Sequence, residues 1–181
     1  MIDEIMEYNR KFVENKGYEP YLTSKYPDKK LAILTCMDTR LLELLPAALG
    51  IKNGDAKIIK NAGGVIVHPY GSVVRSLLVG ILELGVEEVM VIGHTDCGVQ
   101  GMDGHEMLEK LVERGIDQQH IDIVRHSGID LERWLGGFES VESSVHETVR
   151  RLKEHPLMPK NVRISGFIMD SATGELTRVE G

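Results

Sequence analysis

Both cysteines of this chain and one of its histidines fall in two short motifs that could bind a metal. Cys36 begins the segment Cys-Met-Asp-Thr-Arg, and His94 and Cys97 belong to the segment Gly-His-Thr-Asp-Cys-Gly. The spacing of His94 and Cys97 lets a tight turn bring both side chains to one ion. Zinc prefers thiolate and imidazole ligands, and three protein ligands rather than four are typical of a catalytic site with an open position. The sequence therefore predicts one zinc ion per chain on Cys36, His94 and Cys97.

Asp38 and Arg40 follow Cys36 at intervals of two residues. If this segment is extended, the three side chains lie on one side of the chain. Asp38 could then accept a hydrogen bond from a hydroxide on the zinc, or bind the zinc itself as a conditional fourth ligand, while Arg40 holds the carboxylate with two hydrogen bonds. The alternative is an ordinary surface ion pair, which contributes little. We interpret Asp38 and Arg40 as a catalytic pair.

Gly63 and Gly64 end the loop Asn-Ala-Gly-Gly, which follows an expected strand. Glycine permits a close approach of the backbone, so the N–H groups of this loop could bind the oxygens of a substrate anion. A plain turn between a strand and a helix explains the same residues equally well, and both interpretations stay open.

Short apolar runs alternate with amphipathic segments, which predicts an α/β fold with a mainly parallel central sheet flanked by helices. The expected strands are residues 31–35, 56–60, 88–92 and 162–168, the last followed by a turn and a short tail. The expected helices are residues 2–16, a short helix with Pro46 in its first turn that stops at Gly50, residues 71–84, and a stretch from 104 to about 154 broken near Gly115, Gly128 and Gly136-Gly137. Cys36 and His94 end the first and third strands, and ligands of such sheets gather beyond the carboxyl ends of the strands.

The length of 181 residues predicts a single domain, residues 1–181, in which residues 1–30 form an N-terminal amphipathic helix and a connecting loop. One stripe of this helix is mostly apolar and needs a surface to cover it: it consists of Ile2, Ile5, Met6, Asn9, Phe12 and Val13. That surface is either the helix's own domain or a second subunit.

The formal net charge is -7 and no Lys/Arg-rich stripe is present, which weighs against nucleic acid or an anionic membrane as a partner. The sequence contains no apolar run of membrane-spanning length, and its first residues do not form a secretory signal. We therefore expect a cytoplasmic protein. The absence of a Cys-x-x-Cys motif argues against a thiol redox protein.

The segments CMDTR, NAGG and GHTDCG, in this order and spacing, resemble the β-class carbonic anhydrases over about residues 30–104. The segment GFIMDSATGEL is similar to the last strand and turn of that family. The short chain and Thr39 resemble its compact prokaryotic branch.

The resemblance implies reversible hydration of carbon dioxide to bicarbonate and a proton by zinc-bound hydroxide, with zinc on Cys36, His94 and Cys97 and with Asp38 and Arg40 as the dyad. It also implies a homodimer or higher homo-oligomer in which the N-terminal helix packs on the partner subunit. Two thiolates cancel the formal charge of the zinc ion, so its water should be less acidic than the water of a three-histidine site, whose pKa is about 7.

The chain departs from parts of the wider family. Aromatic and glutamine residues that form the substrate pocket in many members have no assignable counterpart. Members with an anion-regulated closed state carry a tryptophan three positions before the first ligand cysteine, where this chain has Ile33. Two other functions stay open: a related zinc hydrolase of carbon disulfide or carbonyl sulfide, and a non-catalytic zinc-binding or nucleotide-binding module, which would need neither Asp38 nor Arg40.

Overall fold

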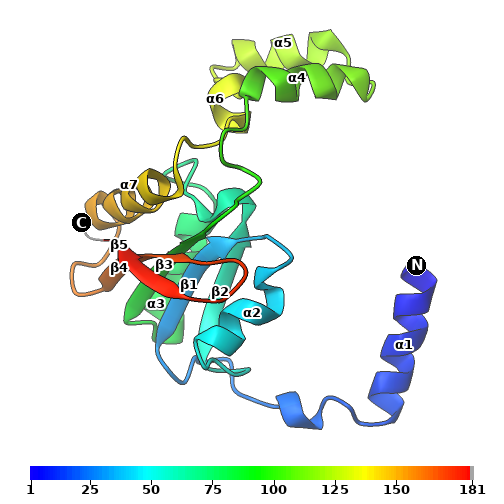
Figure 1. Cartoon of the computed structure of the whole chain (residues 1–181), viewed down its shortest axis with the longest axis vertical. Helices are drawn as coiled ribbons and strands as arrows, with labels where there is room; N and C mark the ends of the chain where they lie inside the picture. The colour runs from blue at the N-terminus through cyan, green and yellow to red at the C-terminus, as the bar shows by residue number, and fades with distance from the viewer. Residues whose placement is uncertain (180–181) are drawn as a thin grey trace.

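The structure, a computed structural model that describes residues 1–179, is built around a five-stranded sheet (Figure 1). The strands are β1 (Leu31–Cys36), β2 (Ala56–Asn61), β3 (Glu88–His94), β4 (Arg163–Met169) and β5 (Leu176–Val179). Their order is β2-β1-β3-β4-β5, with the first four parallel and β5 antiparallel to β4. The predicted fold class is confirmed. The expected tail after the last turn is instead a short edge strand, except for residues 180–181, which lie outside the described part of the chain.

Alternate residues of the central strands point to opposite faces of the sheet and pack into two separate hydrophobic cores. Ala32 and Leu34 of β1 pack with helices α3 (Ser72–Leu84) and α7 (Val141–Glu154) on one face of the sheet. Ile33, between them, packs with helix α2 (Leu41–Ala48) on the other face. Because β1 is covered on both faces, its sequence is a continuous apolar run rather than an alternating one.

Helix α2 begins earlier than expected, and Pro46 lies in its interior rather than in its first turn. The backbone N–H of Leu41 donates to the carbonyl of Asp38, so the chain turns into the helix directly after the strand end. Pro46 removes one backbone donor, but the helix continues only to Ala48, and this limits the cost of the missing bond. Gly50, with φ +62°, lies just beyond the end, as expected.

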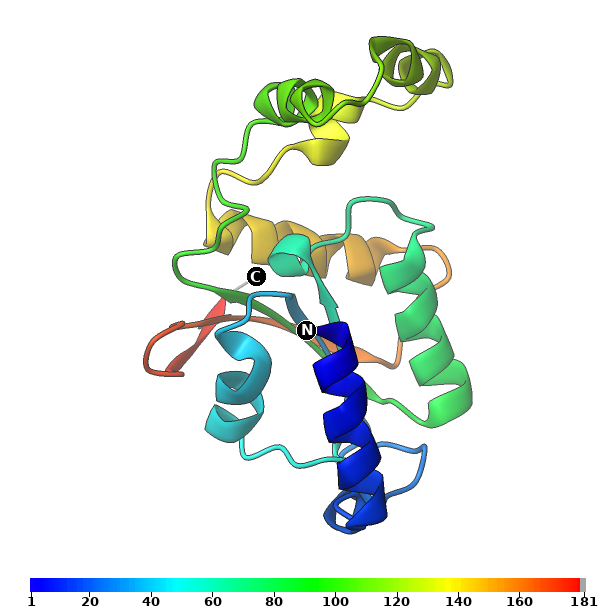
Figure 2. The ribbon, with the colours of Figure 1, turned by 90° about the vertical axis from the view of Figure 1, so that its right-hand side faces the viewer.

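The stretch after Gly104 divides into α4 (Gly104–Glu113), α5 (Gln118–His126), α6 (Leu131–Leu135) and α7, with breaks at the predicted glycines. The first three helices form an arm that stands away from the sheet (Figures 1 and 2). Leu108, Ile121 and Leu131 form a small core of its own within the arm. At its base, the N–H of Gly101 donates to Phe138 and the N–H of Gly137 donates to Met102, so the two connecting segments run side by side.

Helix α1 (Ile2–Glu14) also stands apart from the sheet, and a short 3-10 helix, η1 (Glu19–Tyr21), lies in the segment that joins it to β1 (Figure 1). None of the residues of α1 is buried, and Ile2, Ile5 and Met6 are each more than half exposed. Within the described residues, α1 therefore does not fold back onto its own domain. No helix among these residues is both long enough and apolar enough to cross a membrane.

Candidate metal centre

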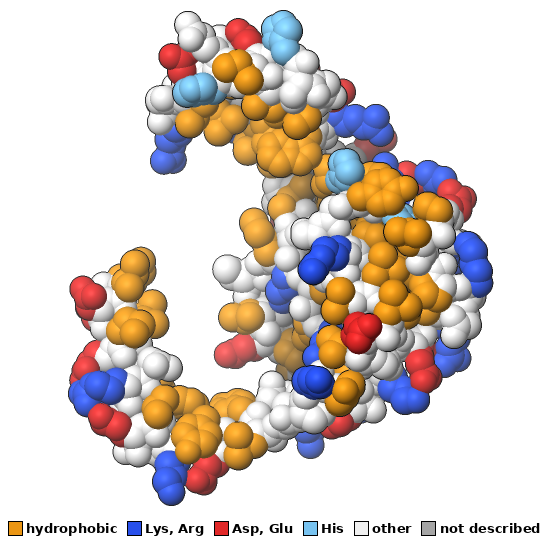
Figure 3. All heavy atoms as spheres, turned by 180° about the vertical axis from the view of Figure 1, so that it is seen from behind, with side chains coloured by type: hydrophobic (Ala, Val, Ile, Leu, Met, Phe, Trp, Pro, Cys, Tyr) orange, Lys and Arg blue, Asp and Glu red, His pale blue; other side chains and the backbone are white. Residues whose placement is uncertain are grey.

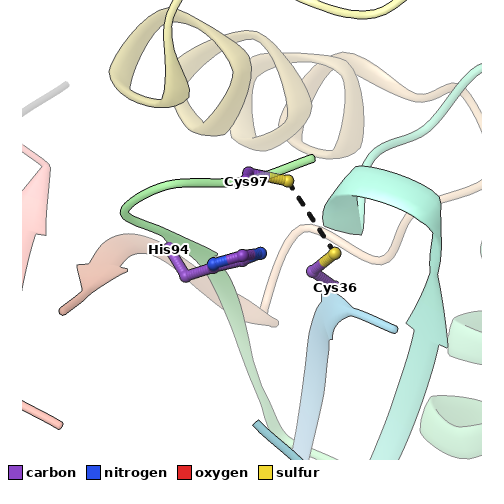
Figure 4. A group of neighbouring side chains, drawn as sticks. All are labelled: Cys36, His94 and Cys97. Carbon is purple, nitrogen blue, oxygen red and sulfur yellow. Dashed lines mark hydrogen bonds between the residues drawn. The ribbon is translucent and has the colours of Figure 1, made fainter. Parts of the chain in front are cut away.

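Three potential metal ligands meet at the carboxyl edge of the sheet. β1 and β3 are parallel neighbours, so Cys36 at the end of one lies beside His94 at the end of the other. Cys97 returns to the same place through a sharp turn in which Asp96 adopts φ +53°. One ligand atom from each of the three residues lies within 4.8 Å of the others, and all three residues are buried (Figure 4).

The hydrogen bonds of His94 determine which ring nitrogen is free. Nδ1 lies 2.8 Å from the backbone carbonyl oxygen of Thr95, which can only accept, so Nδ1 carries the proton and donates. In this tautomer the lone pair of the ring is on Nε2. This atom is the one buried side-chain nitrogen or oxygen of residues 1–179 that has no hydrogen-bond partner. A bound cation would supply the missing partner, since ligand histidines commonly donate their other N–H to a carbonyl in this way.

The two cysteines also suit a zinc ion. Their Sγ atoms are 3.9 Å apart, and two sulfurs on a tetrahedral zinc, each at about 2.3 Å, lie about 3.8 Å apart. Without a cation, burial and the nearby Cys36 raise the pKa of the Cys97 thiol. A cation between the sulfurs would reverse this effect by stabilising both thiolates. The residues present therefore fit zinc.

Asp38 and Arg40 form a bidentate pair beside this cluster. Arg40 Nε donates to Asp38 Oδ1 at 3.0 Å and Arg40 Nη2 donates to Oδ2 at 2.8 Å. The segment is not extended as expected, because β1 ends at Cys36 and the chain turns at Thr39 and Arg40. The side chains meet because the backbone N–H of Arg40 donates to Asp38 Oδ1 at 2.8 Å, which folds the segment back on itself.

The position and charge of Asp38 both matter for an ion at the cluster. Its Oδ2 atom lies 3.9 Å from the free Nε2 of His94. The hydrogen bonds from Arg40 hold the pKa of Asp38 well below its usual range. Asp38 is therefore an ionised carboxylate within reach of any cation bound to His94.

Two further residues contact this site and were missed by the sequence reasoning. Asp96 accepts hydrogen bonds from Arg40, and Lys60 donates to the carbonyl of Cys36 at 3.3 Å. Burial lowers the pKa of Lys60, while the charges of Cys36 and Asp38 oppose this shift. The position of Asp96 inside the His-x-x-Cys motif is a signal that could have drawn attention to it.

Gly63 and Gly64 lie in a 3-10 turn, η2 (Ala62–Gly64), with φ values of +83° and +65°. A Cβ atom on Gly64 would be 2.9 Å from the carbonyl carbon of Thr35 and 3.0 Å from the nitrogen of Cys36. The turn therefore packs directly against the end of β1, next to Cys36. This packing explains why residue 64 is a glycine without any contact to a substrate. A substrate-binding role for the N–H groups of the turn stays a prediction.

The site opens into a large hollow between the sheet and the arm, with a volume of about 2090 Å³. Near the cluster, its walls include Ala62, Val65, Val99 and Phe138. On the arm side, Trp134 and Ile129 line it and are 56% and 48% exposed. Figure 3 shows hydrophobic side chains gathered on the arm where it faces the rest of the molecule. Cys36 and Asp38 thus line a recess whose walls are mainly apolar.

Comparison with known families agrees with this geometry. The carbonic anhydrase family profile matches residues 31–176, which contain all three potential metal ligands and the whole sheet up to the first residue of β5. The chain belongs to this family, and its relatives place it in the β class, a class of lyases.

Individual relatives refine the assignment. The chain is 52% identical over 175 residues to the Bacillus subtilis protein named "Putative carbonic anhydrase YvdA", covering 97% of this chain and 89% of that protein. It superimposes on the crystal structure of β-carbonic anhydrase isoform I of Trichomonas vaginalis with a TM-score of 0.88 and 35% identity, covering 99% and 97% of the two chains. It is also 31% identical to a carbon disulfide hydrolase of Acidithiobacillus thiooxidans, over 82% of this chain and 76% of that protein.

Proposed function

We propose that this protein catalyses the reversible hydration of carbon dioxide to bicarbonate and a proton, with zinc held by Cys36, His94 and Cys97. The observation that carries the proposal is the unpartnered Nε2 atom of the buried His94, in a residue that clusters with two buried thiols and lies beside an ionised carboxylate. Membership of the carbonic anhydrase family supports the same reaction. A non-catalytic zinc module would leave the Asp38–Arg40 pair without a purpose.

When bound, zinc would supply a Lewis acid that lowers the pKa of a coordinated water. The chain's own contribution begins with Asp38. Because Arg40 keeps this carboxylate ionised, Asp38 can accept hydrogen bonds but cannot donate them. An O–H group held near His94 would therefore donate its hydrogen to Asp38, and this hydrogen bond would fix its orientation.

The apolar wall next to the cluster suits a small, uncharged substrate. Val65, Val99 and Phe138 offer no charged group, so carbon dioxide can approach the ligands without losing strong hydration. The glycine turn packs against this wall, since a Cβ atom on Gly63 would be 3.0 Å from Phe138 and 3.4 Å from Val99, and we take it as the candidate contact for the oxygens of bicarbonate.

Hydrolysis of carbon disulfide or carbonyl sulfide is the second candidate, because a relative at 31% identity is named a carbon disulfide hydrolase. The same metal centre could attack either linear molecule, so the walls of the recess decide. The test uses one zinc-loaded preparation in parallel assays, which measure the hydration of carbon dioxide and the release of hydrogen sulfide from carbon disulfide or carbonyl sulfide. We expect hydration to dominate. Faster hydrogen sulfide release would assign the second function, and a lack of both activities in a fully zinc-loaded protein would overturn the proposal.

We also propose that the protein is a homodimer or a higher homo-oligomer and works in the cytoplasm. The apolar stripe of α1 is exposed, and so are Leu42 of α2 and Ile58 of the edge strand β2, at 67% and 41%. A second copy of the chain would remove this apolar surface from water. The two cysteines form no disulfide, which suits a reducing compartment such as the cytoplasm.

Light scattering at micromolar concentration should give at least twice the mass of the chain. The change Ile5→Glu, in the middle of the stripe, should weaken the assembly, whereas Glu4→Gln, on the opposite side of α1, should leave it unchanged. A monomer mass for the unmodified protein would exclude the dimer.

A further inference from the structure

Arg40 connects the two loops that carry the potential metal ligands. Its Nε and one hydrogen of Nη2 bind Asp38, on the loop after Cys36. Its Nη1 donates to Asp96 Oδ2 at 2.7 Å, and Nη2 also donates to the backbone carbonyl of Asp96 at 2.8 Å, on the loop between His94 and Cys97. Four of the five N–H groups of the guanidinium are thereby used. The fork is held from both sides and has little freedom to rotate.

The backbone conformation of Asp96 directs both its side-chain carboxylate and its backbone carbonyl toward Arg40. Asp96 has φ +53°, a conformation that costs most residues free energy but that Asp and Asn tolerate better. The preceding residue is fixed independently, since the N–H of Thr95 donates to the carbonyl of Met169 at 3.0 Å and its hydroxyl accepts from the N–H of Ser171 at 3.0 Å. The carboxylate of Asp96, which is 85% exposed, is thus carried on a rigid turn even though it lies at the surface.

The orientation of Arg40 decides where Asp38 points. Asp38 Oδ2 lies 3.9 Å from His94 Nε2, so a modest rotation would bring this carboxylate onto a cation held by His94. The bidentate contact with Arg40 opposes that rotation. Any group that fixes Arg40 therefore also acts, through Arg40, on whether Asp38 reaches the metal position.

We propose that Asp96 is a positioning residue that holds the Arg40 guanidinium on Asp38 and thereby keeps Asp38 away from the metal. This inference rests on the proposed zinc site. Loss of the Asp96 carboxylate removes a hydrogen-bond acceptor of the guanidinium, which can then rotate and bind Asp38 less firmly. The fraction of molecules in which Asp38 occupies the open coordination position then increases.

The experiment uses the full chain loaded with cobalt(II), whose visible spectrum reports its ligands. Azide displaces an exchangeable ligand but competes poorly with a bound Asp38. In Asp96→Gly, which removes the carboxylate and suits the positive φ, we expect the apparent affinity for azide to fall about two- to fivefold, the size of one exposed ion pair. The kcat/KM of the zinc form should fall by a similar factor, with one metal per chain retained. Asp96→Asn, which keeps a hydrogen-bond acceptor and tolerates the same φ, should fall between Asp96→Gly and the unmodified protein.

A double-mutant cycle shows whether Asp96 acts through Arg40. Once Arg40→Ala has been made, adding Asp96→Gly should change neither azide affinity nor kcat/KM, because the group that Asp96 holds is gone. The charge control is Glu139→Gln, an exposed change at the end of the arm that should leave both quantities as they are. Unchanged azide affinity in folded Asp96→Gly and Asp96→Asn, or additive effects in the cycle, would overturn the proposal. The cobalt titration does not depend on carbon dioxide turnover, so failure of the proposed function would be recognised separately.

Discussion

The Sγ atoms of Cys36 and Cys97 lie 3.9 Å apart although 61 positions separate the two residues in the sequence. Two features of the chain produce this distance. β1 and β3 are adjacent and parallel, so their carboxyl ends coincide, and the left-handed turn at Asp96 reverses the chain so that Cys97 faces Cys36. Two buried thiols this close to a histidine nitrogen without a partner form a poor packing arrangement but a good metal site.

The first prediction concerns the ligands. The unmodified protein should contain about one zinc per chain, and Cys36→Ala, His94→Ala and Cys97→Ala should each lose the metal or bind it much more weakly, because only two ligands remain. The matched control is His120→Ala on α5, an exposed histidine of the arm, which should keep its zinc. The measurement is elemental analysis after gel filtration. Full zinc in all three ligand variants would refute the assignment.

The second prediction concerns the dyad. Arg40→Ala should retain zinc, since Arg40 is not a ligand, but should lower kcat/KM about 30- to 150-fold, corresponding to about 2–3 kcal/mol, because Asp38 loses the partner that orients it. Arg114→Ala, at the end of α4, is the control for loss of an arginine and should be neutral. If kcat/KM stayed unchanged in Arg40→Ala, the pair would be incidental to the reaction.

The third prediction concerns where Asp38 points in the metal-loaded protein. Ile33 stands where anion-regulated members of the β class carry a tryptophan, and its side chain is fully buried under α2, so it offers no indole N–H to an anion. Asp38 should therefore remain on Arg40 at mildly alkaline pH, leaving the open coordination position to water or another small ligand. Activity should rise with pH without steep inhibition by bicarbonate. A crystal structure of the zinc form at this pH with Asp38 bound directly to zinc would contradict the expectation.

The fourth prediction concerns stability and pH. Arg150 and Arg151 donate to Glu147 and lower the pKa of this carboxyl from 4.5 to about 2. A carboxyl with a lowered pKa in the folded state stabilises the protein above the unfolded pKa and loses that contribution as the pH falls toward the folded pKa. Glu147→Gln should therefore reduce the free energy of unfolding by about 0.5 kcal/mol at neutral pH, a small value because the pair is partly exposed.

This difference between Glu147→Gln and the unmodified protein should shrink as the pH falls from about 4.5 to about 2. Urea unfolding of the two proteins at several pH values gives the comparison, and Glu113→Gln on the arm should show no such trend. A difference that grew on acidification would mean that the Glu147 pKa is not lowered.

The strands, and the two motifs whose residues meet at Cys36, His94 and Cys97, could be read from the sequence because their signals are local. β1 is buried on both faces and so appears as an unbroken apolar run that ends at Cys36. The spacing of His94 and Cys97 needs only one turn, and strand ends in a parallel sheet meet at one edge. That β1 and β3 are neighbours is a tertiary feature, but ligand sites at the carboxyl ends of such strands are a general rule of these sheets.

The features that the sequence reasoning missed depend on tertiary contacts. Helix α2 starts at a turn after Asp38, which also brings Asp38 and Arg40 together. No signal in the sequence marks this turn, so the helix was wrongly expected to start near Pro46. β5 is short, with an exposed Thr177 and Arg178, and becomes a strand only by pairing with β4. Asp96 meets Arg40 across 56 positions of the sequence, and no periodicity reports such a contact.

The most direct test of the account is stopped-flow measurement of carbon dioxide hydration by one preparation in three states: loaded with zinc, stripped with a chelator, and loaded again. Hydration should be rapid with zinc, should be lost on removal of the metal and should return on reloading, because the proposed reaction depends on a metal at Cys36, His94 and Cys97. A protein with one zinc per chain that hydrates carbon dioxide no faster than buffer would contradict it.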